Sequence, residues 1–242
     1  MTALIGSADC PPTRLAATRD GLHRVAEHLL AAARYAASGE IGLVPAPGGF
    51  RTPSFGPDSR FLAVNGAELV VGCAGTTRRS ALTTIRAAAE FAGVTPGAPA
   101  RVYQPATRLD LDEPLMIDSR AARLLAEWYQ LGAQALRRFA AEVPGDRPSA
   151  AVLWPEHFDV GITAGAINYG ASPGDDHIAD PSCTWARTTG LRRATRRSGT
   201  PRSGRPAPSA RSAPWPRRRH SSATAGPVRS PLPRLPRSAG HH

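Results

Sequence analysis

Three segments of the chain space their apolar residues at steps of three and four, the period of an amphipathic helix. The first is predicted to begin near Thr18 or Asp20, either of which can cap it, and to end at Gly39. His23 and His28 are five residues apart on this helix, so we interpret them as separate flank residues. The apolar stripe of this helix consists of Leu22, Val25, Leu29 and Ala33.

The longest predicted helix starts at Asp118 or Ser119 and runs to about Glu142. A shorter helix precedes it and is capped by Thr83 or Thr84. The long helix has an apolar stripe made of Ala121, Leu124, Trp128, Leu131, Ala135 and Phe139. We expect this stripe to face the core.

Short apolar runs between the helices predict strands. The strongest signal is a hairpin over residues 60–71, because Asn65-Gly66 suits a two-residue type I′ turn. The remaining predicted elements are strands at 41–44, 101–104, 150–154, 158–162 and 166–169, and a Pro- and Gly-rich loop at 45–50. This order predicts an α+β fold with an antiparallel or mixed sheet and about three helices.

Composition changes abruptly after Pro181. Residues 182–242 hold 14 of the 30 basic residues and none of the 19 acidic ones, and every basic residue is Arg. The segment is mostly Arg, Pro, Ser, Ala, Thr and Gly, which bury too little apolar surface to offset the entropy of ordering. We therefore predict a flexible N-terminus (1–16), one α+β domain (17–181) and a disordered basic tail (182–242).

Two interpretations of this tail stay open. Its arginines would neutralise phosphates, which favours non-specific nucleic-acid binding. Only Trp185 and Trp215 in this segment could stack on bases. Alternatively, the tail is an out-of-frame translation of a GC-rich gene, because Arg, Pro, Ala and Gly have GC-rich codons. Read one frame on, codons for residues 182–187 can encode Leu-Tyr-Val-Gly-Pro, which suits a strand.

The rest of the chain indicates a cytoplasmic protein with no membrane partner. No apolar run approaches the ~18–20 residues of a membrane-spanning helix, and the start lacks the pattern of a secretory signal. Cys10, Cys73 and Cys183 are far apart, which excludes a disulfide framework and a cysteine zinc site.

Polar residues are densest between positions 154 and 180. If residues 154–162 are extended, His157 and Asp159 point to the same face. Together with Asp175 they are candidate ligands for a divalent metal, and His157 with Asp159 is also a candidate catalytic base and orienting acid. Alternatively, this region lines a pocket for a small molecule, or its residues only complete a turn. The candidate ligand-binding residues are Trp154, Glu156, Asn168, Tyr169, Ser172 and Asp176.

Two motifs here, Leu153-Trp-Pro-Glu-His-Phe-Asp159 and Asn168-Tyr-Gly-Ala-Ser-Pro-Gly-Asp-Asp176, resemble a conserved protein family of high-GC bacteria. The resemblance extends over about residues 18–180. Family members tend to continue with Tyr-Val-Gly-Pro and Phe-Trp-Asn-Ala-Pro-Phe-Gly segments; this chain departs from them after Pro181, where the shifted frame would restore them. The resemblance implies no activity. Three function classes therefore remain: a small-molecule-binding domain, a metal-assisted or acid–base enzyme, and a nucleic-acid-binding protein.

Overall fold

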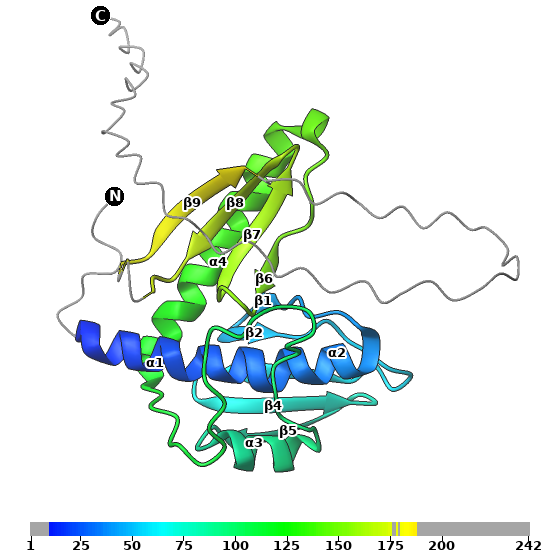
Figure 1. Ribbon diagram of the computed structural model, residues 1–242, viewed down its shortest axis with the longest axis vertical. Coiled ribbons are helices and arrows are strands. Elements are labelled where there is room, and N and C mark those ends of the chain that lie inside the picture. Colours follow the sequence, from blue (N-terminus) through cyan, green and yellow to red (C-terminus); the bar gives the residue numbers. More distant parts are fainter. Residues whose placement is uncertain (1–9, 176–177, 179, 188–242) are drawn as a thin grey trace, which may run out of the picture. The chain divides into compact units, whose positions relative to one another are not determined.

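The computed structural model describes residues 10–175, 178 and 180–187 (Figure 1). Over these residues the chain forms three helical segments and two antiparallel sheets, so the predicted α+β fold is confirmed. No helix in the described part of the chain combines the length and the apolarity that crossing a bilayer requires.

The first helical segment is continuous but changes its winding in the middle. It consists of α1 (Pro12–Val25), a π-helical turn η1 (Ala26–Ala31) and α2 (Ala32–Ser38). The helix begins at Pro12, earlier than predicted, because proline suits the first helical position. Thr18 is fully buried and caps nothing in α1, whereas Gly39 ends α2 in the left-handed conformation, as predicted.

The first sheet is a meander of five antiparallel strands in sequence order. The predicted loop at 45–50 is wrong in part, because it forms the β1–β2 hairpin, in which Gly48 has a φ of +77°. The predicted hairpin at 60–71 is confirmed, but its turn is Gly66-Ala67, with a positive φ only at Gly66, as in a type II′ turn. The strands are β1 (Val44–Ala46), β2 (Gly49–Arg51), β3 (Phe61–Asn65), β4 (Glu68–Cys73) and β5 (Thr76–Ala81).

The two later helices, α3 (Ile85–Ala92) and α4 (Ser119–Glu142), start where the sequence predicts. Thr84 caps α3 through Ala87 N–H, and Asp118 caps α4. The predicted face of α4 is wrong in part: Ala121 is buried and Trp128 and Phe139 pack against the core, but Leu131 is 44% exposed. The buried stripe contains Ala122, Leu125, Tyr129, Ala133 and Leu136. Residues 101–104, predicted as a strand, form turns and irregular chain.

The second sheet follows α4 and a short 3₁₀ turn η2 (Pro144–Asp146). Its strands are β6 (Val152–Trp154), β7 (Asp159–Ala164), β8 (Ile167–Ser172) and β9 (Ser182–Arg187), all antiparallel. Ser182–Arg187, which the sequence analysis assigned to the tail, pairs with β8 along its whole length. Trp185 is 72% exposed, and the remainder of the predicted tail, including Trp215, lies outside the described residues.

Helix α4 packs against strands of both sheets, and the sheets meet at their β1 and β6 edges. Leu43, next to β1, exchanges two 2.8 Å backbone hydrogen bonds with Leu153 of β6. Beside this junction, the rings of Phe50, Tyr129 and Phe158 meet edge to face, with centroids 5.4–6.4 Å apart. This aromatic cluster fixes the turn between β6 and β7 against α4 and the first sheet.

Candidate functional site

A cavity of about 530 Å³ lies beside α1. Four segments form its wall: α1, the irregular chain at 106–116, the β6–β7 turn (155–158) and residues 174–175. The polar and aromatic side chains that line it are those of Arg19, Asp20, His23, Arg24, Thr107, Arg108, Glu113, His157, Phe158 and Asp175.

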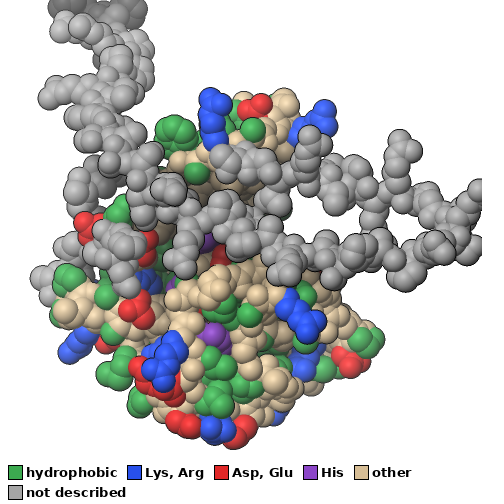
Figure 2. All heavy atoms as spheres, viewed as in Figure 1, with side chains coloured by type: hydrophobic (Ala, Val, Ile, Leu, Met, Phe, Trp, Pro, Cys, Tyr) green, Lys and Arg blue, Asp and Glu red, His purple; other side chains and the backbone are tan. Residues whose placement is uncertain are grey.

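Ion pairs give the cavity wall both signs of charge. Arg24 Nη1 lies 2.6 Å from Glu113 Oε2, and the guanidinium of Arg19 lies 2.9 Å from Asp20 Oδ1. Basic and acidic side chains also lie next to one another elsewhere on the face shown in Figure 2. The cavity therefore offers donors and acceptors to a ligand without a strong excess of either charge.

His23 lies at the cavity wall with its ring in a fixed tautomer. Its Nε2 is 2.7 Å from the carbonyl oxygen of Pro155, and since a carbonyl only accepts, Nε2 carries the proton and Nδ1 the lone pair. The ring stacks on Phe158 at 4.9 Å. Burial lowers the pKa of His23 more than the nearby Glu27 raises it, so the ring is neutral at neutral pH.

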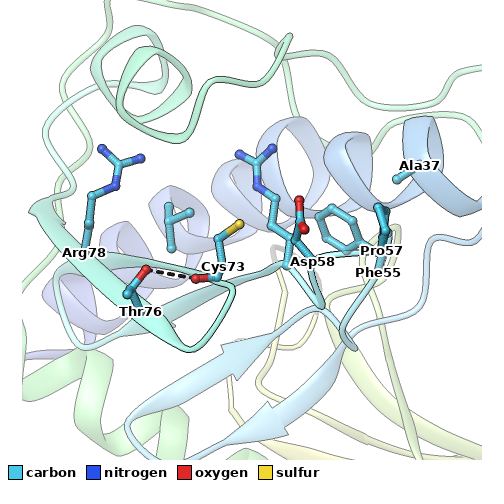
Figure 3. A pocket seen from close by; sticks show the side chains of 10 residues that line it. Ala37, Phe55, Pro57, Asp58, Cys73, Thr76 and Arg78 are labelled. Carbon is cyan, nitrogen blue, oxygen red and sulfur yellow. Dashed lines mark hydrogen bonds between the residues drawn. The ribbon is translucent and has the colours of Figure 1, made fainter.

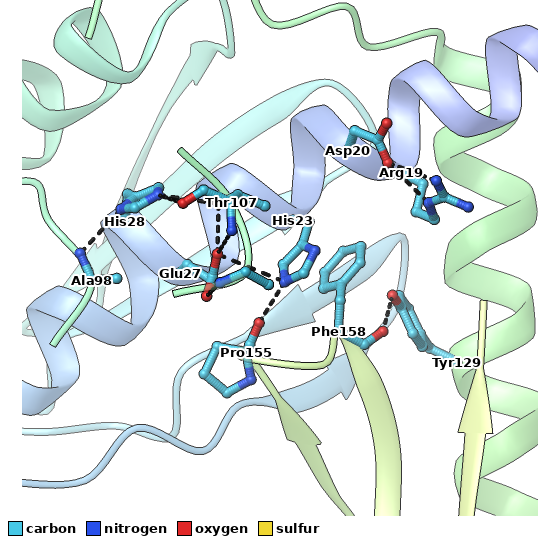
Figure 4. A network of polar contacts seen from close by, with 11 residues as sticks. Arg19, Asp20, His23, Glu27, His28, Ala98, Thr107, Tyr129, Pro155 and Phe158 are labelled. Atoms are coloured by element: carbon cyan, nitrogen blue, oxygen red, sulfur yellow. Dashed lines mark hydrogen bonds and ion pairs between the residues drawn. The ribbon is translucent and has the colours of Figure 1, made fainter. Parts of the chain in front are cut away.

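Glu27 is a fully buried carboxylate behind this wall (Figure 4). Its oxygens accept hydrogen bonds from Ala106 N–H (2.9 Å), Thr107 N–H (2.8 Å) and the Thr107 hydroxyl (2.5 Å). His23 Nε2 lies 3.8 Å away. Three donated bonds stabilise the ionised carboxylate inside the protein.

His28 completes this network on the other side of Thr107. Its Nδ1 accepts from Ala98 N–H at 3.1 Å, so Nε2 carries the proton, and it lies 3.2 Å from the carbonyl oxygen and 3.1 Å from the hydroxyl oxygen of Thr107. Burial lowers the pKa of His28 despite the neighbouring Glu27. The π-helical turn η1 carries both Glu27 and His28, and such turns are frequent at functional sites.

Tyr103 and Glu156 bring two further acidic groups into the same region. The Tyr103 hydroxyl and Glu156 Oε2 are buried and have no hydrogen-bond partner among the described residues. Burial raises the pKa of Tyr103, and the carboxylates of Glu27 and Glu156 raise it further. Burial is also the main reason that the pKa of Glu156 is raised.

The predicted catalytic and metal-binding residues are only partly brought together. His157 and Asp175 line the cavity, but Asp159 does not. Residues 154–162 are not one extended segment, because Pro155–Phe158 form a turn in which Phe158 has a φ of +53°. No three His, Cys, Asp or Glu side chains of the described chain converge on a point that would suit a metal ion, so the predicted metal set is not assembled.

The predicted ligand-binding residues mostly serve other contacts. The Trp154 side chain lies over Gly161, Asn168 Oδ1 accepts from the Thr163 hydroxyl, and Tyr169 packs against Phe139. Ser172 Oγ accepts from Gly174 N–H, and Asp176 lies outside the described residues. Of the predicted ligand-binding residues, only Glu156 lies close to the buried side chains of Tyr103 and Glu27.

The sequence analysis missed His23, Glu27, His28 and the segment that binds them. The interpretation of the two histidines as flank residues is wrong, because their side chains belong to one buried network. A signal was present in the sequence: Glu27-His28 is the only polar pair between Val25 and Ala33, and a helix that is apolar all round is buried together with any polar residue in it.

A second cavity, of about 400 Å³, lies between α2, the 55–60 turn and strands β4 and β5 (Figure 3). Cys73 lies on its wall with Arg60 and Arg78. Both arginines already donate to carbonyl groups at the end of α3, Arg60 to Ala92 and Arg78 to Phe91. Their guanidinium groups therefore stabilise that helix end.

Comparison of the chain with protein-family models, with curated proteins and with solved structures gives no match.

Proposed function

We propose that this protein acts in the cytoplasm by binding a small polar molecule in the cavity beside α1. The observation that carries the proposal is the cavity itself, whose volume of about 530 Å³ is typical of small-molecule sites. Its wall combines apolar surface from Phe158 with the Arg24–Glu113 ion pair and the imidazole of His23. Such a mixture orients a ligand through a few polar contacts.

The exposures of Arg24 and Glu113 indicate which ligand group the cavity takes. The Arg24 side chain is 14% exposed and that of Glu113 is 53% exposed, so the carboxylate is the partner that can move away. An anionic ligand group can then replace it at the guanidinium, which binds carboxylates and phosphates well. A donor group on the same ligand suits Nδ1 of His23.

The test is a binding screen by ¹H–¹⁵N NMR on the labelled full chain, with a panel of small carboxylic acids, amino acids and phosphate esters. We expect the shifted amides to lie in residues 106–116 and 155–158, and Arg24→Gln to weaken binding roughly tenfold or more. Arg78→Gln, at the second cavity, is the matched control and should leave the affinity unchanged. Shifts confined to the second cavity, or unaltered binding by Arg24→Gln, would refute the proposal.

A second function, acid–base catalysis, is favoured by one observation. His23 is a neutral imidazole with its tautomer fixed by Pro155, and it lies at the wall of the cavity, as a general base requires. If a panel compound that binds is also converted, we expect His23→Gln to abolish conversion while the affinity changes little. Conversion that continues in this variant would show that His23 is not the base. Binding without any conversion would show that the cavity binds this compound but does not catalyse its reaction.

A further inference from the structure

Residues 97–118, which we call the strap, run from near the end of α3 to the start of α4 and cross the first helical segment (Figure 1). The strap contains no helix or strand. Pro99 and Leu115 are buried near its two ends, whereas the side chains from 100 to 114 are exposed or half-buried. Burial of apolar surface therefore holds its middle less firmly than its ends.

Polar contacts with two adjacent residues of η1 hold the first half of the strap. At its start, Gly97 N–H donates to the His28 carbonyl (2.8 Å) and Ala98 N–H donates to the His28 ring. In its middle, Ala106 and Thr107 donate to Glu27. The acceptor for Ala98 is the lone pair of a neutral imidazole, and it is lost when His28 gains a proton.

Residues 111–118 of the strap are also held by groups that do not titrate: Arg86 N–H donates to the Leu111 carbonyl (2.9 Å), Leu115 N–H to the Thr83 carbonyl (2.8 Å), and Asp118 N–H to the Thr18 hydroxyl (2.9 Å). Two ion pairs lie at the exposed side of the same part of the strap. Arg24 pairs with Glu113, and Arg86 binds Asp112 through two bonds of 2.7 and 2.8 Å. The side chains of both acids are more than half exposed, and ion pairs of this kind hold little against solvent. Leu111 adds a partly buried apolar contact.

We propose that the strap is a pH-sensitive gate of the cavity, closed by neutral His28 and ionised Glu27 and released when His28 is protonated. Because residues 106–108 of the strap form part of the cavity wall, release of its first half opens the cavity on that side. A proton on Nδ1 of His28 would place two N–H donors against each other at 3.1 Å, His28 and Ala98. The same proton would leave the Thr107 contacts of Nε2 intact.

Charged groups on several elements act on this equilibrium. Glu27 favours the protonated ring and Arg24 opposes it, but burial in the closed protein opposes it most. Facing Glu27 are His23 on the same helix, Tyr103 of the strap and Glu156 of the β6–β7 turn. Protonation of His23 is disfavoured as it is for His28, because burial lowers the pKa of His23 as well.

The direction of the effect follows from the lowered pKa of His28. In an open strap the ring has its ordinary pKa of 6.5, whereas the closed strap disfavours the charged ring. The closed form is therefore fully favoured above that pH and loses its advantage as pH falls toward the lower value of the closed form. For one linked proton, the loss is at most about tenfold per pH unit.

Hydrogen–deuterium exchange of the intact full chain tests this gate without any ligand, so the result is independent of the proposed function. Peptides covering 97–108 are compared at about pH 7.5 and about pH 5.5, with labelling times scaled for the slower chemical exchange at the lower pH. We expect strap protection to fall by up to about tenfold per pH unit. Peptides of α4 should keep their protection.

His28→Asn keeps an acceptor oxygen near the position of Nδ1 and removes the titrating ring. We expect strap protection in this variant to be independent of pH. The matched control is His157→Asn, which removes an exposed histidine of the same cavity and should preserve the pH response. A pH response that persists in His28→Asn, or that disappears only in His23→Asn, would overturn the assignment to His28.

A titration of the wild-type protein by NMR covers the case in which His28→Asn does not fold. The ring nitrogen signals should identify Nε2 as the protonated nitrogen of His28 at neutral pH. The Ala98 amide should shift with the midpoint of the His28 ring, below pH 6.5. A Nδ1-protonated ring at neutral pH, or an Ala98 amide that does not follow the ring, would refute the gate.

Discussion

At the scale of single residues, Glu156 is a carboxylic acid whose ionisation the fold disfavours. Burial raises its pKa, and the carboxylates of Asp159 and Glu27 raise it further, against the opposing effects of its own N–H and of His157. The contribution of the protonated acid to stability is therefore complete below the ordinary pKa of 4.5. It is lost as pH rises through the higher value of the folded protein.

Glu156→Gln, which cannot ionise, should consequently raise the melting temperature at about pH 8. An increase of roughly 2–4 °C corresponds to ~1 kcal/mol in a domain of this size. The gain should shrink as the pH is lowered toward about 4, where the wild-type acid is itself protonated. Differential scanning calorimetry over this range measures it, with the exposed Glu142→Gln as control; equal melting of Glu156→Gln and wild type at pH 8 would contradict the prediction.

Tyr129 joins α4 to the β6–β7 turn through a single buried hydroxyl. Its oxygen donates to the carbonyl of Phe158 at 2.9 Å, and burial raises the pKa of this phenol well above its usual range. Tyr129→Phe should cost about 1–3 kcal/mol in urea unfolding, because the Phe158 carbonyl is left buried without that donor. The control is Tyr35→Phe, whose hydroxyl has no hydrogen-bond partner among the described residues; equal losses in both variants would contradict this role.

At the scale of elements, the contact between α4 and β8 depends on a glycine. A Cβ placed on Gly132 would lie 2.6 Å from the Cβ of Ala171, so the helix and the sheet could not stay at their present distance. Gly132→Ala should therefore destabilise the protein by about 1–3 kcal/mol, although alanine favours helices by ~1 kcal/mol. Gly145→Ala is the control, since it meets nothing within 4 Å and should change the free energy of unfolding by less than about 0.5 kcal/mol.

The same close contact explains what the sequence could and could not predict at this scale. Helix α4 and its cap at Asp118 follow from local signals, and they are confirmed. The buried face of α4 does not follow from local signals, because the helix has two apolar stripes with the same spacing. One stripe contains Leu131 and the other contains Tyr129. The small residue Gly132 selects the second stripe, since only that side lets α4 approach β8 closely.

The candidate site could be predicted only where it coincides with a dense polar segment. His157 and Asp175 were found in this way and do line the cavity. Glu27 and Thr107 are 80 residues apart, and only the folded chain brings them within hydrogen-bond distance. Local patterning carries no information on such a pairing, although a polar residue inside an apolar stripe indicates that some buried partner exists.

At the scale of the whole molecule, positive charge is concentrated beyond the second sheet. Thirteen of the 30 basic residues and no acidic residue lie after Arg187. We expect the full chain to bind duplex DNA without sequence preference and to lose affinity by roughly a thousandfold between about 50 and 200 mM salt. A chain that ends at Arg187 should not bind it.

This truncation also tests whether the folded part is independent of residues 188–242. The melting temperature and the small-molecule screen should be unchanged in the chain that ends at Arg187, since the cavity and both sheets are complete within it. Fluorescence anisotropy with labelled DNA and calorimetry measure the two effects. DNA binding by the truncated chain would assign that activity to the folded part, and its failure to melt cooperatively would show that the folded part depends on residues 188–242.

The junction between Leu43 and Leu153 has a consequence for biosynthesis. In each sheet the paired strands are neighbours in sequence, so each sheet can form soon after its strands leave the ribosome. The junction between the sheets forms later, because Leu43 pairs with a residue more than a hundred positions further on. Until β7 and β8 emerge, the side of α4 that they will cover stays exposed. A nascent chain stalled before that point is thus the form of this protein that most needs a chaperone.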